Sequence, residues 1–145
     1  MKIPSRVRAR KDYIQFLKNL EVVDICLTDC IAKFDKQLLT SSPKQISISG
    51  RSSFARPLIS KSDFTVAATM EVIIGGSAKS EAIAKIRVTY NLTFIVRGGE
   101  LDTIHIGQFS KSNIKIVIWP FFREFIHNMT ARFGIPHVNV PIHSE

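Results

Sequence analysis

The segment "DFTVAATMEVII" (residues 63–74) alternates apolar side chains with small or polar ones, position by position. A period of two is typical of a β-strand with one buried face. The segment "EAIAKIRVTYNLTFIVR" (81–97) repeats the alternation, and "GGSAKS" (75–80) between them has the glycines of a turn. We therefore expect an antiparallel hairpin with one face that needs a cover. The more polar face of its second strand carries Lys85, Arg87, Thr89, Asn91 and Thr93.

Three elements are expected before this hairpin. Residues 5–19 have apolar positions at helical spacing, which predicts a short amphipathic helix within a basic N-terminal segment, 1–20. Residues 21–34 alternate and predict a first strand. After the break "TSSP" (40–43), a second strand is expected over 44–56, with a bend or bulge at Gly50. This second strand places three apolar residues on one face: Ile46, Ile48 and Phe54.

Cys26 and Cys30 lie in the first predicted strand. Its alternation places them on one face, roughly 13 Å apart, which is too far for a disulfide. None of the four histidines has a recognisable metal-ligand spacing to this pair. We expect two ordinary buried thiols and no metal site.

A long helix is predicted over residues 113–134, after strands over 21–97 and an irregular connection over 98–112. Asn113 is a candidate N-cap and Gly134 a natural C-cap. Pro120 should either kink this helix or occupy the first position of its main segment. An extended tail is expected over 135–145. The helix is apolar over more of its circumference than one sheet can cover, so self-association is expected.

Composition limits the function classes. A chain of 145 residues with 45% hydrophobic and 22% charged residues is the size of one globular domain, and no run is long enough to span a bilayer. We expect a soluble, cytoplasmic protein. The net charge is +8, and residues 1–20 hold six Lys or Arg against one acid, Asp12. A small basic nucleic-acid-binding protein, or an oligomeric adaptor, is therefore an alternative function.

The motif "WPFFRE" (119–124), followed by "TARFGIPHVNVP" (130–141), resembles the SecB family of export chaperones and their SecB-like relatives. The resemblance implies an α+β fold, with a four-stranded antiparallel sheet followed by a long helix, assembled as a dimer of dimers. The short N-terminal helix is an addition to that pattern. The motif residues are expected at the oligomer interface: Trp119, Pro120, Phe121, Phe122, Arg123, Glu124 and Phe125.

The same resemblance implies an ATP-independent holdase that binds unfolded polypeptide, such as preproteins, in apolar grooves and needs no cofactor. Ile46, Ile48 and Phe54 are the candidate client-binding residues. Two departures from the family pattern bear on partners. The export chaperones dock on the motor SecA through an acidic sheet surface, whereas the body of this chain is weakly basic. They also have a further helix after the tail strand, and none is expected here. The added N-terminal basic helix and the early stop resemble the SecB-like chaperones that protect antitoxins in toxin-antitoxin systems.

The long helix contains residues that could suggest catalysis. Glu124 and His127 have an E-x-x-H spacing, but a di-metal site needs a second such set and the sequence shows none. The pair Arg123 and Glu124 is better explained as charges held at a subunit interface. The expected protein is not an enzyme.

Overall fold

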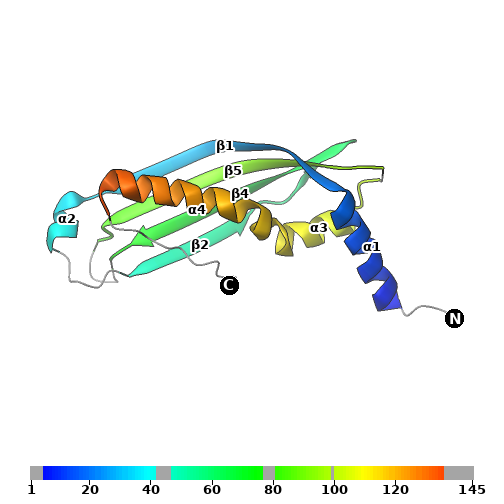
Figure 1. Cartoon of the computed structure of the whole chain (residues 1–145), viewed down its shortest axis with the longest axis horizontal. Helices are drawn as coiled ribbons and strands as arrows, with labels where there is room; N and C mark the ends of the chain where they lie inside the picture. Colours follow the sequence, from blue (N-terminus) through cyan, green and yellow to red (C-terminus); the bar gives the residue numbers. More distant parts are fainter. Residues whose placement is uncertain (1–4, 42–46, 77–80, 99, 136–145) are drawn as a thin grey trace.

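The computed structural model describes residues 5–41, 47–76, 81–98 and 100–135, which form one antiparallel sheet with a long helix along one face and shorter helices toward its ends (Figure 1). The strand order is β1-β5-β4-β2, and the short β3 also pairs with β4. The strands are β1 (Leu20–Phe34), β2 (Ile48–Phe54), β3 (Leu58–Ile59), β4 (Asp63–Ile74) and β5 (Ala84–Val96). The helices are α1 (Ser5–Asn19), α2 (Lys36–Ser41), α3 (Thr103–Ser112) and α4 (Ile114–Phe133). The predicted α+β fold is confirmed.

The β4–β5 hairpin is the centre of the sheet and of the core. Its register pairs Phe64 with Phe94 and Ile74 with Ala84, so the apolar positions of both strands share one face. Phe64 and Phe94 are fully buried and stack at 5.1 Å, and the Phe109 ring of α3 meets both edge-on. The predicted alternation is therefore confirmed, and helices α3 and α4 supply the cover that it required.

Helix α3 corrects one prediction. The connection over 98–112 was expected to be irregular, but its second part is helical from Thr103 to Ser112. The Asp102 side chain accepts hydrogen bonds from the backbone N–H groups of Ile104 and His105, an N-cap that begins the helix. Ile106 and Phe109 are buried on the side of the helix that faces the sheet. Glycine and serines within this segment obscured the helical period.

Helix α4 has the predicted length but differs from expectation in two details. Gly134 ends it in the left-handed conformation, φ 75°, as predicted. Pro120 lies inside the helix on an exposed position, so the first-position alternative is wrong, and the alternative of a kink stays a prediction. Asn113 stands at the N-cap position, but its side chain makes no capping hydrogen bond. The buried stripe repeats every four residues: Ile114, Ile118, Phe122, Ile126 and Thr130.

Strand β1 contains two irregularities, between Val22 and Asp24 and between Leu27 and Asp29. The second one reverses the face of the residues that follow it. Cys26 pairs with Asn91 on the outer face, whereas Cys30 pairs with Val88 on the helix face, and both thiols are exposed. The expectation of two buried cysteines on one face is therefore wrong. No shift interrupts the pairing of β2 with β4 around Gly50, so the bulge predicted there is absent.

Some expectations fall outside the described residues. These are Ile46, the turn residues 77–80, and the predicted tail apart from Ile135, which is buried. Among the described helices, none is both long and apolar enough to cross a membrane.

Candidate functional site: apolar hollows beside the long helix

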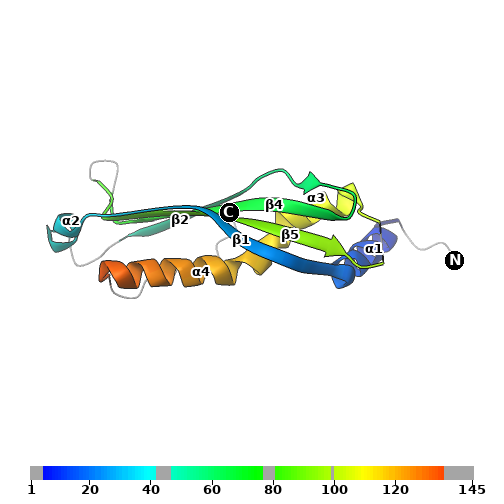
Figure 2. The ribbon, with the colours of Figure 1, turned by 90° about the horizontal axis from the view of Figure 1, so that it is seen from above.

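Helix α4 lies over the central strands and leaves the two edge strands partly uncovered. Toward β1, the Phe133 ring stacks on Phe34 at 4.9 Å. Toward β2, the Lys115 ammonium lies 6.0 Å from the centre of the Phe54 ring. Figure 2 shows the helix along one side of the sheet. Two lateral surfaces therefore exist, one on each side of α4.

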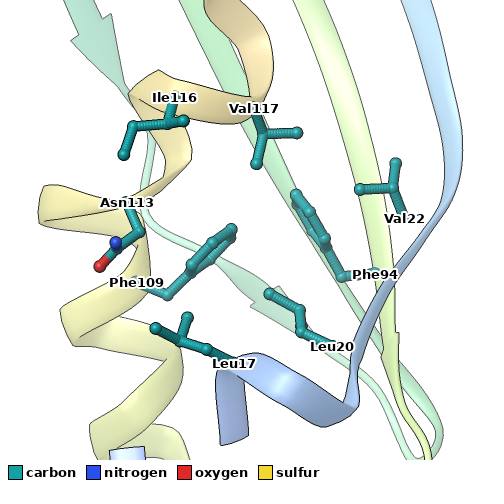
Figure 3. A pocket seen from close by; sticks show the side chains of 8 residues that line it. All are labelled: Leu17, Leu20, Val22, Phe94, Phe109, Asn113, Ile116 and Val117. Carbon is teal, nitrogen blue, oxygen red and sulfur yellow. The ribbon is translucent and has the colours of Figure 1, made fainter. Parts of the chain in front are cut away.

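The first hollow opens between α4 and the start of β1 and has a volume of about 250 Å³. Figure 3 shows its side chains converging from α1 and β1 on one side and from α3 and α4 on the other. Asn113 supplies its polar group, and the rest of the lining is apolar. The lining residues are Leu17, Leu20, Val22, Phe94, Phe109, Asn113, Ile116 and Val117.

Exposed apolar side chains continue beside this hollow. Val22 and Leu27 belong to the helix face of β1, because the register pairs them with Phe94 and Tyr90. They are nevertheless 38% and 44% exposed, and on α4 Ile116 is 72% exposed. Phe121, whose ring lies 6.3 Å from that of Tyr90, is 38% exposed. An apolar surface of this kind is typical of a binding site.

Helix α1 closes one end of the hollow. The Tyr13 hydroxyl donates a 2.6 Å hydrogen bond to Asn113 Oδ1, and the Tyr13 and Phe16 rings pack on His105 of α3. Burial raises the pKa of Tyr13 above its usual value. In the first half of α1, Arg6, Arg8 and Arg10 are exposed. Among the side chains that the structure describes, the anchors of this helix therefore lie in its second half.

A second, smaller hollow lies on the β2 side of α4. Its volume is about 20 Å³, and it is lined by Ser52, Phe54, Met70, Lys115, Ile118, Trp119 and Phe122. Phe54 therefore does lie in a depression, half-buried. Ile48 shares the helix face with Phe54, as the pairings with Ile74 and Ala68 show, and is 39% exposed. The two candidates are on one face as predicted, but Ile48 does not line this hollow.

The motif residues of α4 divide between its sides. Phe122 is buried against the sheet, Trp119 and Phe125 are half-buried, and Pro120 and Phe121 are exposed. Arg123 and Glu124 are both exposed, and within the described part of the chain neither forms an ion pair. Their placement at a subunit interface stays a prediction.

The chemistry of the site is that of an apolar surface. Among the described residues, no group of three or more His, Cys, Asp or Glu could hold a metal ion. The group with a shifted pKa beside α4 is Tyr90, whose pKa is raised mainly by burial and further by the charge of Glu124. A tyrosine held in its neutral form donates a hydrogen bond but supplies no base at neutral pH.

The first hollow was not predicted from the sequence. Leu17, Leu20 and Val22 occur where a helix passes directly into a strand, so neither period marks them as one surface. Their meeting with Ile116 and Val117 follows from long-range packing. The signal that was available was the excess of apolar residues on the first half of α4.

Comparisons with known proteins support the architecture. No protein-family profile and no curated protein matches the sequence. Among solved structures, the chain is similar to a Mycobacterium tuberculosis SecB-like chaperone in complex with a ChAD peptide from the HigA1 antitoxin. The TM-score is 0.71 at 18% identity, over 95% of this chain and 97% of that one. A Streptococcus agalactiae protein of unknown function matches with a TM-score of 0.48 and 8% identity, over 85% and 97%. Since the first likeness extends over nearly all of both chains, the protein has the SecB-like fold.

Proposed function

We propose that the protein is an ATP-independent chaperone that holds unfolded polypeptide against the apolar surface between α4 and β1. The observation that carries the proposal is the first hollow, which has a volume of about 250 Å³ and no charged side chain in its lining. Such a surface accepts apolar side chains of a client whatever their order in its sequence. It offers no nucleophile, acid or base, so the protein is not an enzyme in this proposal.

The client binds as an unfolded segment because only an unfolded chain exposes several apolar side chains in a row. Binding the unfolded state withdraws it from refolding and aggregation, with no energy source needed. The solved SecB-like chaperone carries an antitoxin peptide. A dedicated client of that kind, or preproteins more generally, would satisfy the same surface here.

The proposal includes assembly into a homotetramer in the cytoplasm. Phe121 is 38% exposed, and Trp119, on the β2 side of α4, is half-buried. Burial of the motif residues between subunits would remove this apolar area from water. Repeated hollows in a tetramer would then hold one long client at several points, which raises its retention through effective concentration.

A matched pair of variants tests the client surface. Ile116→Asp places a charge in the hollow, whereas Ile104→Asp places one on α3, where Ile104 is 77% exposed and lines neither hollow. We expect the wild type and Ile104→Asp to delay refolding of a chemically unfolded client. Ile116→Asp should lose most of that delay while light scattering gives an unchanged mass. A wild type that gives no delay at several-fold excess would contradict the proposal.

Ile48 and Phe54 remain candidate client contacts on the β2 side. Ile48→Asp should weaken client binding with the oligomer intact, and Ile59→Asp is its control on the same edge, since Ile59 is similarly exposed. Adding SecA to the client complex separates general export from a dedicated client. A refolding delay without a SecA complex is the expected result, given the basic charge of the chain.

Nucleic-acid binding is the second candidate function, favoured by the exposed cations of α1. Phosphate contacts weaken steeply with salt and should disappear when residues 1–12 are removed. Apolar client binding should survive both changes. Tight, salt-sensitive binding of an oligonucleotide, with no effect on an unfolded client, would favour this alternative.

A further inference from the structure

The outer face of the sheet, opposite α4, carries an ordered arrangement of charge. The described helices α3 and α4 pack on the other face, as Figure 2 shows for α4. The register places Arg87 beside Glu71, which in turn pairs with Arg51, and in the next outer row Lys33 pairs with Lys85. These cations come from β1, β2 and β5 and share one end of the outer face. We name them the outer basic patch: Lys33, Arg51, Lys85 and Arg87.

The outer basic patch is only partly neutralised within the described chain. All four side chains are exposed, and the ion pair found there joins Lys85 Nζ to Glu71 Oε2 at 3.8 Å. Lys33 lies directly opposite Lys85. Like charges facing each other across neighbouring strands destabilise a sheet. A local conflict of this kind, kept on an uncovered surface, is typical of a functional site.

Away from the patch, the same face carries several carboxylates, one of which, Glu21, forms an ion pair with Arg97. Glu21 and Asp63 both pair with Ile95, and Asp24 and Asp29 pair with Thr93 and Thr89 on the outer side. Successive outer rows are about 7 Å apart along a strand, and neighbouring strands are about 4.8 Å apart. The patch therefore covers only the area of a few extended residues. A longer anion that followed the strands would run onto the carboxylates.

We propose that the outer basic patch docks a short acidic segment of a partner polypeptide. Its carboxylates would neutralise Arg51, Arg87 and Lys33 and relieve the repulsion between Lys33 and Lys85. The carboxylates along the rest of the face disfavour a long polyanion, which favours a short peptide over a nucleic acid. The site lies on the face opposite the hollows, so the inference goes beyond the proposed chaperone function and does not depend on it.

The test uses a labelled twelve-residue peptide of Glu, Asp, Gly and Ser, titrated with the full-length protein. The variant Lys33→Gln/Arg51→Gln/Arg87→Gln removes three charges from the patch. The variant Lys11→Gln/Arg56→Gln/Lys61→Gln removes three exposed charges elsewhere and is the matched control. We expect the patch variant to weaken the peptide Kd by about tenfold or more and the control by less than about twofold. Binding should also weaken with added salt.

A second variant separates docking from a structural role. Lys33→Glu replaces the like-charge pair with an opposite-charge pair, so it should raise the unfolding midpoint while weakening the peptide complex. Equal losses in both triple variants, or no saturable peptide binding by the wild type, would overturn the proposal. Tighter binding of an oligonucleotide, lost in the same patch variant, would overturn it in favour of nucleic acid.

Discussion

Strands β1 and β5 are neighbours with the same alternating pattern, yet their helix faces differ in burial. On β5, Leu92 and Phe94 are fully buried beneath the helices, whereas on β1 Val22 and Leu27 are 38% and 44% exposed. The cause is the position of α4, which covers the centre of the sheet and not this edge. The same side-chain chemistry therefore stabilises the fold on one strand and is available for binding on the next.

A pair of leucine truncations gives the largest expected effect. Leu92→Ala leaves a cavity in the core and should lower the free energy of unfolding by about 2–5 kcal/mol. Leu27→Ala, on the exposed face, should cost the isolated chain less than about 1 kcal/mol. Urea unfolding at low protein concentration measures both changes. Equal losses in a monomeric sample would show that the helix face of β1 is covered within the chain.

Removing one hydroxyl tests the attachment of α1, with an intermediate effect. Tyr13→Phe deletes the hydrogen bond to Asn113 and should cost about 0.5–1.5 kcal/mol. Because burial raises the pKa of Tyr13, its contribution is complete below the ordinary tyrosine pKa of about 10 and is lost as pH rises through the folded-state value. The wild type should therefore lose more stability than the variant between pH 9 and 11, at about 25 °C, if α1 is anchored there. Parallel curves over that range would argue against the anchor. Tyr90 titrates with the same sign in both proteins and cancels in the difference.

The outer face gives the smallest expected effect. Thr69 and Thr89 share a 2.8 Å hydrogen bond between their hydroxyls, both half-exposed. Thr69→Val should change the free energy of unfolding by about 0.2–1 kcal/mol, the range for a cross-strand pair. A loss as large as that of Leu92→Ala would mean that the outer face is also part of a core. Thermal unfolding is sensitive enough to rank these variants.

The sequence predicted the parts of the fold that local patterns determine. The β4–β5 alternation, the amphipathic helix over residues 5–19 and the Gly134 cap are all confirmed. The irregularity between Leu27 and Asp29 could not be predicted, because it depends on pairing with β5 and no glycine marks it. It reversed the face of Cys30 and, with it, the expectation for the two thiols.

The candidate site was less accessible to sequence reasoning than the fold. The apolar excess of α4 indicated a covered surface, but the choice of β2 as the groove floor followed from its place in the sequence. The larger hollow lies toward β1, where α1 and the start of the strand meet α3 and α4. Which edge strand a helix leaves uncovered depends on the angle at which it crosses the sheet, and no local sequence pattern predicts that angle.

The central claim is that a client lies on the helix face of β1. Site-specific crosslinking tests this claim most directly. A photoreactive amino acid replaces Leu27 on the helix face or, as the control, Asp24 on the outer face of the same strand. Each protein is mixed with an excess of unfolded client and irradiated. We predict client adducts from position 27 and few or none from position 24. Adducts from position 24 alone, or adducts from position 27 only to a second copy of the chain, would contradict the account.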